Sequence, residues 1–250
     1  MMKFEQALKY FREKKFEEPR WISVVYGVLL GVVVLCFIVV PLFVFQTVPV
    51  MMQSMKPTIH GGIEGTNVLE DCVGLSLLSG YGHGDIVVFD RRENGTTTRL
   101  IKRILGEPGD TLFLVDDDGD GRADAVEIET ELNGAPRARY RLIESYLNDE
   151  YGHYVANDEV IEKRNASKYD TARALWSEAG LTLGENEYFV AGDNRRISSD
   201  SFTKIGTVDG NAILGKAVCI FTKTKHSFLF WRIYDAKGVG PGTVFQKTQS

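Results

Sequence analysis

The sequence predicts a mainly β domain that follows a single N-terminal transmembrane helix. Two observations carry this prediction: a charge-free apolar run near the N-terminus, and short β-branched segments separated by glycine and aspartate through the rest of the chain. The 250 residues are 44% hydrophobic, so they can supply one membrane segment and a separate domain with its own core. Charged residues make up 25%, an ordinary globular value that argues against wholesale disorder.

The apolar run, residues 22–45, is predicted to be a transmembrane helix. Its 24 uncharged residues, at about 1.5 Å of rise each, cross a hydrocarbon core of about 30 Å with some tilt. A cleavable signal peptide is the alternative, but its apolar core would be shorter. Small residues are also missing at the positions that such cleavage needs after Phe45.

Charges on the two sides of the run predict its orientation. Residues 1–21 form a basic segment with six Lys/Arg, whereas Lys56 is the only basic residue in the 20 positions after the run. The positive-inside rule places the N-terminus in the cytoplasm and residues 46–250 outside, as a single-pass protein of the cytoplasmic membrane. Residues 21–250 hold 30 acidic and 23 basic groups, which argues against nucleic acid as a partner.

Strands are predicted in the outer domain where β-branched and aromatic residues cluster between turn residues. They cover 85–90, 99–105, 111–115, 125–132, 187–192 and 212–221. Many short strands with glycine turns indicate a β-barrel or sandwich. Residues 139–180 are the least strand-like and are expected to form a small inserted α+β subdomain. Within it, residues 167–180 predict a helix with Ser167 or Asp170 as N-cap and Gly180 as the stop.

Two polar residues have the properties of a nucleophile and a base. Ser54 lies near Pro57, whose fixed φ defines the turn that carries the hydroxyl. Lys102 is expected to share a strand face with Leu100 and Ile104, where desolvation disfavours the ammonium. A neutral lysine can remove the proton of a serine hydroxyl, which is the Ser-Lys form of nucleophile activation.

Four segments in order resemble the sequence boxes of type I signal peptidases, the membrane-bound Ser-Lys serine proteases of bacteria. The similarity spans about residue 20 to about residue 233, and the boxes are 54–58 (Ser-Met-x-Pro-Thr), 84–87 (Gly-Asp-Ile-Val), 102–110 (Lys-Arg, then Pro-Gly-Asp) and 192–201 (Gly-Asp-Asn-Arg-x-x-Ser-x-Asp-Ser). The resemblance implies a signal-peptidase-type β domain. It also implies an endopeptidase that cleaves N-terminal signal peptides from exported pre-proteins after small residues, of the Ala-x-Ala type.

The resemblance implies a role for each matching residue. Ser54 would be the nucleophile and Lys102 the general base that later protonates the leaving amine. Ser198 matches the serine that hydrogen-bonds the catalytic lysine. Asp193 and Asp200 match the acidic residues that hold the last box in place.

The resemblance also implies the substrate contacts and the partners. Met55 and Ile101, which neighbour the reacting pair in sequence, are expected to form the shallow apolar pockets for small side chains at positions −1 and −3. The implied partners are signal peptides, the lipid bilayer and the translocation machinery. No cofactor is required for catalysis.

The chain departs from the family pattern at two positions. Met52 stands where the family often has Ser or Gly that contributes to the oxyanion hole, and a thioether cannot donate a hydrogen bond. Phe202 stands where the family usually has an Arg paired with the aspartate at position 200, so that pair is lost or rebuilt with Arg195, Arg196 or Lys204. A histidine base marks the endoplasmic-reticulum branch, but all four histidines lie outside the boxes: His60, His83, His153 and His226.

An acidic segment gives a second, independent signal. Its residues fit the calcium-loop spacing D-x-D-x-D-G-x5-E from position 116 to position 127. The flanks are strand-like rather than helical, so the functional hypothesis is a hairpin tip that holds a structural Ca²⁺ through Asp116, Asp118, Asp120 and Asp124. The alternative is a solvated acidic turn.

Other hypotheses stay open at this point. The protein could be a relative that processes one dedicated partner protein, or a non-catalytic membrane-anchored β domain that binds exported chains. Cys72 and Cys219 could pair if the fold brings them together.

Overall fold

A computed structural model describes residues 20–39, 45–62, 71–78, 80–147, 163–228, 231–238 and 243–248. The side chains of residues 222–244, and those of Arg20, Phe45 and Ser145, are not described. The chain divides into two compact units, Met1–Val44 and Phe45–Ser250. The basic segment expected at the N-terminus lies outside the described residues, apart from its last two.

The described residues of the first unit form an apolar helix, α2 (Arg20–Val34), which continues into a π-helical stretch, η1 (Leu35–Val39). Trp21–Val39 is long and apolar enough to cross a membrane, with a mean hydropathy of 2.9 over 18 residues. The predicted helix extended to Phe45, but Phe45 begins a strand instead.

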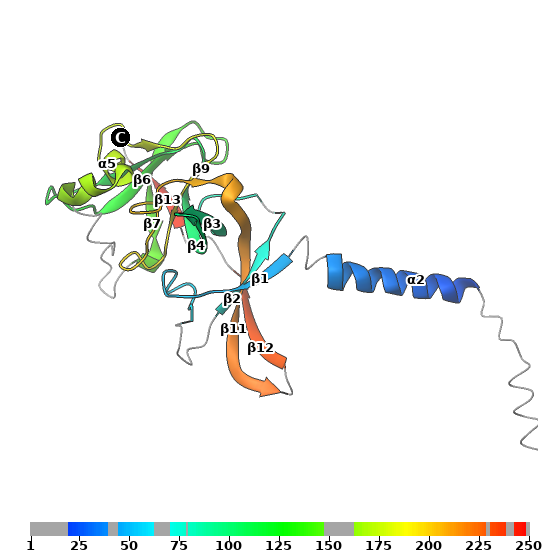
Figure 1. Cartoon of the computed structure of the whole chain (residues 1–250). Coiled ribbons are helices and arrows are strands. Elements are labelled where there is room, and N and C mark those ends of the chain that lie inside the picture. The colour runs from blue at the N-terminus through cyan, green and yellow to red at the C-terminus, as the bar shows by residue number, and fades with distance from the viewer. Residues whose placement is uncertain are drawn as a thin grey trace, which may run out of the picture. The chain divides into compact units, whose positions relative to one another are not determined.

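The second unit is mainly β, as predicted, and consists of two open sheets (Figure 1). The first sheet has 8 strands, in the order β1-β2-β11-β3-β4-β9-β10, with β12 paired to β11. The second has 5 strands, in the order β13-β7-β6-β5-β8. The bounds in the first sheet are β1 (Phe45–Pro49), β2 (Asp71–Ser76), β3 (Ile86–Glu93), β4 (Thr96–Gly106), β9 (Glu187–Ala191), β10 (Val208–Asp209), β11 (Ile213–Phe228) and β12 (Trp231–Gly238). Those in the second are β5 (Thr111–Val115), β6 (Ala125–Thr130), β7 (Ala138–Glu144), β8 (Leu181–Thr182) and β13 (Thr243–Lys247).

The six predicted strands correspond to β3, β4, β5, β6, β9 and β11. The segment expected as an insertion, 139–180, differs from the prediction because its first part is β7, which pairs with both β6 and β13. Arg139 and Arg141 alternate with Tyr140 and Leu142 along this strand. The arginines pair with Glu127 of β6, so one face of β7 is charged and gives a weak strand signal in the sequence.

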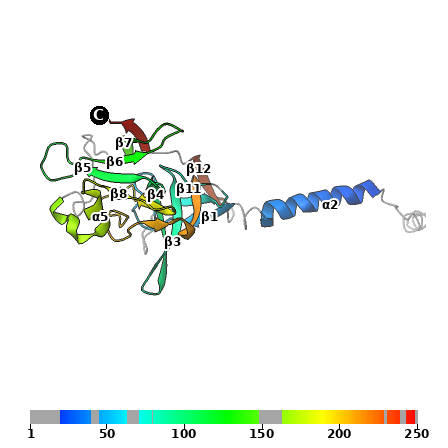
Figure 2. The same ribbon diagram turned by 90° about the horizontal axis from the view of Figure 1, so that it is seen from above.

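The helical part of this segment is shorter than predicted. It comprises the 3-10 helices η2 (Ser145–Leu147) and η3 (Lys163–Lys168), and helix α5 (Asp170–Leu175). The N-cap of α5 is Tyr169 and makes no side-chain cap, so both predicted caps were wrong. α5 lies beside β5 and β8 (Figure 2). One further 3-10 turn, η4 (Gly210–Ala212), precedes β11.

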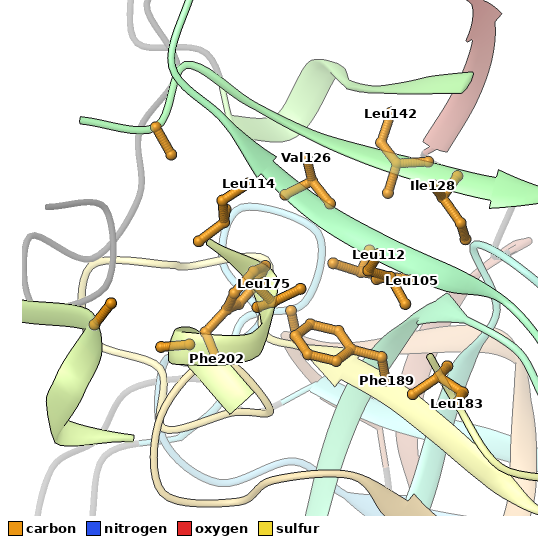
Figure 3. Close-up of a cluster of buried hydrophobic side chains, with 14 residues drawn as sticks. Leu105, Leu112, Leu114, Val126, Ile128, Leu142, Leu175, Leu183, Phe189 and Phe202 are labelled. Atoms are coloured by element: carbon orange, nitrogen blue, oxygen red, sulfur yellow. The ribbon is translucent and has the colours of Figure 1, made fainter. Parts of the chain in front are cut away.

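Three buried clusters form the core of the second unit. The largest packs β5, β6 and β7 against β9 and α5, and includes Leu112, Ile128, Leu175 and Phe189 (Figure 3). A second cluster joins β2, β3 and β11 to the turn that follows β1, through Met55 and Ile59. A third packs β3, β4 and β9 together on the other side. The two smaller clusters therefore flank β3 and β4, the strands on which the candidate site is built.

Candidate active site

Ser54 lies in a tight turn that is anchored by buried side chains of the core. Its neighbours Met55 and Ile59 are 1% and 0% exposed and belong to the second core cluster. The N–H of Ile59 donates to the carbonyl of Met55 at 2.9 Å, which closes the turn. Burial of these two side chains fixes the backbone, so the half-buried Ser54 side chain has a defined position.

Lys102 meets Ser54 from strand β4. It pairs in register with Val87 of β3 and is 3% exposed. Its Nζ lies 2.9 Å from Ser54 Oγ, within hydrogen-bond distance, although the two residues are 48 positions apart. Burial lowers the pKa of Lys102 to about 8, against the opposing effect of the Asp200 and Asp193 carboxylates. About a tenth of the amine is therefore neutral at pH 7, and about half at pH 8.

The loop at residues 192–201 holds the backbone of the Ser54 turn. The Asn194 N–H donates to the Ser54 carbonyl at 2.9 Å, and Asn194 Nδ2 donates to the Gln53 carbonyl at 3.2 Å. Gly192 packs so closely that a Cβ there would lie 2.5 Å from the Ser54 carbonyl oxygen and 2.2 Å from Ser198 Oγ. Neither residue was among the predicted site residues: Gly192 acts through its lack of a side chain, and Asn194 through its N–H and its Nδ2.

Ser198 and Asp200 are both buried beside Lys102, at 2% exposure each. Burial raises the pKa of Asp200 to about 6, and the opposing effects come from the Arg195 and Lys102 charges, the Gly192 N–H and the Ser198 hydroxyl. Ser198 Oγ also lies 3.4 Å from the Ser199 carbonyl. Within the described residues, Ser198 makes no direct hydrogen bond to Lys102 and reaches the lysine's surroundings through Asp200.

Asp193 is held by a second buried charge, Arg103. Arg103 Nε and Nη2 donate to the two carboxylate oxygens at 2.9 and 2.6 Å, and the side chains are 1% and 0% exposed. Thr58 Oγ1 donates to Asp193 at 2.5 Å, and Arg103 Nη1 donates to the Gly84 carbonyl at 2.7 Å. One ion pair thus connects residues from all four sequence boxes.

Breaking this pair is expected to destabilise the fold strongly. Arg103→Met leaves the Asp193 carboxylate buried without its partner, at a cost of about 3–5 kcal/mol in the free energy of unfolding. The matched control is Arg99→Met, which breaks an ion pair with Asp90 whose side chains are 54% and 28% exposed. That exposed pair is worth about 1 kcal/mol or less. Urea unfolding of the two variants measures the difference, and equal effects would contradict the assignment.

An apolar groove of about 350 Å³ opens beside the Ser54–Lys102 pair. It is lined by β1 and the turn after it, by β4, and by the loop that holds Ile197 and Ser199. Ile101 lines this groove, as expected, whereas Met55 does not and lies in the core cluster under the turn. Met52 and Ile197 are 73% and 61% exposed at the groove.

Met52 has an unusual backbone conformation, with φ of 68°. Its N–H donates to the Gly62 carbonyl at 2.8 Å, so neither its backbone N–H nor its thioether is available as an oxyanion donor. The N–H of Ser54, in contrast, donates no hydrogen bond within the described ranges. A positive φ suits glycine better than methionine, which gives a physical reason for glycine at this position.

The acidic turn brings three of its four aspartates together. The carboxylate oxygens of Asp116, Asp118 and Asp120 lie within 4.8 Å of one another. The Asp124 carboxylate instead accepts from the Asp117 N–H at 2.8 Å. Asp116 itself accepts from two backbone N–H groups of the turn, so local hydrogen bonds account for part of this acidic cluster.

His60 and His83 make their contacts with acidic residues other than those beside the Ser54–Lys102 pair. His83 lies between Asp110 and Glu107; burial disfavours its charged form, but these hydrogen bonds outweigh burial and raise its pKa to about 9. His60 lies near Asp71, while His153 and the side chain of His226 fall outside the described residues. Cys72 pairs in register with Phe221, and Cys219 with Gly74, so these two cysteines are diagonal neighbours that form no disulfide.

Comparison with known proteins finds signal peptidases among those similar to this chain. A signal peptidase I of Bacillus licheniformis is 26% identical over 209 residues, which are 83% of this chain and 90% of that protein. A signal peptidase I of Rickettsia typhi is 31% identical over 154 residues, with 57% of this chain and 52% of that protein covered. The crystal structure of a signal peptidase I from Enterococcus faecalis V583 is 26% identical and covers 55% of this chain and 97% of that chain, with a TM-score of 0.36.

The family match covers most of the chain. The model of the family described as signal peptidase, peptidase S26, matches residues 21–222, which include the apolar helix and all four sequence boxes. The chain therefore belongs to the signal peptidase family, peptidase S26, and is a protease of signal-peptide processing.

Proposed function

We propose that Ser54 and Lys102 are the catalytic pair of this signal peptidase. The observation that carries the proposal is the 2.9 Å contact between a serine hydroxyl and a lysine amine that is 3% exposed. Burial lowers the pKa of Lys102 to about 8, which favours the neutral base that serine activation needs. The histidines of the described region lie elsewhere, so lysine is the base within reach.

The geometry supports a two-step acyl transfer. Neutral Lys102 takes the Ser54 proton as Oγ attacks the scissile carbonyl, and then returns that proton to the leaving amine as the C–N bond breaks. Water then attacks the acyl-enzyme through the same base and releases the carboxyl end of the signal peptide. The Ser54 N–H donates to the oxyanion. Stabilisation of the oxyanion therefore rests on this backbone group, because Met52 supplies no donor.

The groove supports cleavage after small residues. It is mostly apolar, and Ile101 contributes its half-buried side chain to the lining next to Lys102. An extended peptide presents alternate side chains to the same wall, so small residues at −1 and −3 would enter together. Met55 supports the turn from beneath and is no longer proposed as a contact.

The apolar helix supports a membrane-anchored protease. We propose that Trp21–Val39 spans the cytoplasmic membrane, with the basic segment in the cytoplasm and the β domain outside. Signal peptides held in the same bilayer would be its substrates, with the lipid and the translocation machinery as partners. Processing of a single dedicated protein is the alternative.

The direct test is cleavage of a pre-protein by the full chain in detergent micelles or liposomes. The wild type is expected to release a mature protein that begins after an Ala-x-Ala sequence, and Ser54→Ala is expected to release none. Full activity of Ser54→Ala would contradict the proposal. Substrates that differ only in the sequence around the cleavage site separate general processing from a dedicated partner.

The pH dependence of kcat/KM is expected to follow the protonation of Lys102. The folded-state pKa of Lys102 is lowered to about 8, and the base is active when neutral. The rate constant kcat/KM is therefore expected to rise with pH and to reach half its maximum near pH 8. Because Lys102 and Asp200 interact, this midpoint belongs to the pair. A midpoint near 6.5, the ordinary value of histidine, would contradict lysine as the base.

We also propose that the acidic turn binds Ca²⁺ as a structural ion, through Asp116, Asp118 and Asp120. Three clustered carboxylates repel one another unless a cation is present, and oxygen ligands suit calcium. At about 100 times the Kd, Ca²⁺ should stabilise the full chain by about 2.7 kcal/mol. The control is Asp118→Asn/Asp120→Asn. No heat of binding and no change in Tm would show that the turn is a solvated hairpin tip.

A further inference from the structure

Near the Ser54–Lys102 pair lies a buried ion pair that the proposed mechanism does not use. Arg195 Nη2 lies 2.5 Å from Glu144 Oε1, and Nη1 lies 3.3 Å from Oε2. The two side chains are 2% and 1% exposed. Removing two charges from water is costly, and apolar residues of similar volume often stabilise a protein as well or better. Stability alone therefore does not explain this pair.

Arg195 contacts the loop that holds Ser54. Its Nε donates to the Gly192 carbonyl at 2.9 Å. Gly192 is the residue that packs against the Ser54 carbonyl and the Ser198 hydroxyl, and its own N–H helps to lower the pKa of Asp200. The Arg195 charge also lowers the pKa of Asp200, which burial would otherwise raise further. One guanidinium thus orients a peptide group behind Ser54 and favours the ionised form of Asp200.

Arg195 also lies against the position where the family pattern has an arginine. Its guanidinium carbon is 5.3 Å from the centre of the Phe202 ring. Phe202 packs edge-to-face on Phe189 at 4.8 Å between centroids, inside the largest core cluster (Figure 3). Arg196 and Lys204, the other cations expected as replacements, are exposed. Arg195 is the cation of the three that is buried beside Asp200.

Glu144, the partner of Arg195, comes from the second sheet. It is the last residue of β7, and it also accepts a short hydrogen bond from Tyr146. The Tyr146 ring in turn lies 4.7 Å from the guanidinium carbon of Arg103, the partner of Asp193. β7 and η2 therefore contact both buried arginines that hold the segment 192–195.

We propose that Arg195, held by Glu144, is a positioning residue for catalysis and takes the place of the arginine that the family pattern has at position 202. This inference rests on the proposed function of Ser54 and Lys102. Arg195 acts through Gly192 and Asp200 and does not touch the substrate. The groove lining includes neither Arg195 nor Glu144, so their loss should lower kcat and leave KM unchanged.

The test measures kcat and KM of the full chain in detergent micelles on a pre-protein. Arg195→Met is expected to lower kcat by about tenfold or more, with KM within about twofold. The matched control is Arg196→Met, which removes an exposed arginine one position away and should change neither constant. Adding Phe202→Arg to Arg195→Met should restore a large part of kcat, because it returns a guanidinium to the same buried space.

A second variant guards against simple loss of folding. Arg195→Met leaves Glu144 buried without its partner, whereas Glu144→Met/Arg195→Met removes both charges and is expected to fold and to keep the low kcat. Wild-type kcat in this folded double variant would overturn the proposal. So would the absence of any kcat gain from Phe202→Arg in the Arg195→Met background. Failure of the proposed function looks different, since Ser54→Ala would then keep its activity.

Discussion

Replacing Lys102 with methionine is expected to remove cleavage activity while raising the stability of the protein. Methionine fills a similar apolar volume but has no lone pair with which to accept the Ser54 proton. Loss of the general base should lower kcat/KM by roughly 10³-fold or more. The serine stays in place because the turn is anchored by the buried Met55 and Ile59, so the loss reports chemistry rather than folding.

The stability gain follows from the sign of the pKa shift. Lys102 titrates at about 8 in the folded protein, below its ordinary value of 10.5, because burial disfavours the ammonium. Below pH 8 the folded protein therefore bears the full cost of a buried charge, and this cost disappears as the pH rises from 8 to 10.5. Lys102→Met removes it, which amounts to at most about 3 kcal/mol at neutral pH.

Unfolding of the variant and the wild type at several pH values measures this gain. The difference between them isolates Lys102, since the opposite contribution of His83, whose pKa is raised to about 9, is common to both proteins. The matched control is Lys204→Met at an exposed position, which should change neither activity nor stability. A Lys102→Met protein that cleaves at the wild-type rate, or that is less stable at pH 7 and equally so at pH 10, would contradict the assignment.

The sequence was most informative where chemistry depends on local side-chain patterns. Strands such as β5 and β6 could be predicted because β-branched and aromatic residues cluster in them between turn residues. Lys102 stood out because an ammonium between Leu100 and Ile104 on one strand face must be desolvated. Its contact with Ser54 depends on the β3–β4 pairing and on the turn after β1, neither of which a single segment specifies.

The start of β1, strand β7 and the buried arginines could not be predicted from the sequence, each for a physical reason. β1 follows the apolar run without a change in composition, so its start at Phe45 was assigned to the helix. β7 was hidden because its arginines pair across the sheet with Glu127. The burial of Arg103 and Arg195 could not be predicted, because their partners Asp193 and Glu144 lie 90 and 51 positions away.

The support of Ser54 depends on backbone groups more than on side chains. Asn194 donates its N–H to the Ser54 carbonyl, Arg195 orients the Gly192 carbonyl, and Gly192 leaves room for both. Groups of this kind have no signature in residue type except for glycine itself. A substitution at Gly192 is therefore the most direct probe of how the loop positions the nucleophile.

Gly192→Ala is expected to disable the site without removing any catalytic group. The new Cβ would lie 2.2 Å from Ser198 Oγ and 2.5 Å from the Ser54 carbonyl oxygen. The Ser198 hydroxyl can rotate away, but Ser198 Cβ, at 2.6 Å, can move only with its loop, and the Ser54 carbonyl can move only with its turn. That movement breaks the hydrogen bond from Asn194 and separates Ser54 Oγ from Lys102. A displacement of about 1 Å should cost roughly 10²-fold in kcat.

A matched glycine control and a stability measurement are needed to interpret the kcat of Gly192→Ala. Gly80→Ala adds the same methyl group where nothing lies within 4 Å, and it should leave kcat unchanged. Overpacking at Gly192 should cost about 1–3 kcal/mol of unfolding free energy, so kcat is compared under conditions where circular dichroism shows a folded protein. If folded Gly192→Ala retains kcat within about twofold of the wild type, the loop does not position Ser54. If kcat falls while KM holds, the close approach of Gly192 to the Ser54 carbonyl is what sets the distance between nucleophile and base.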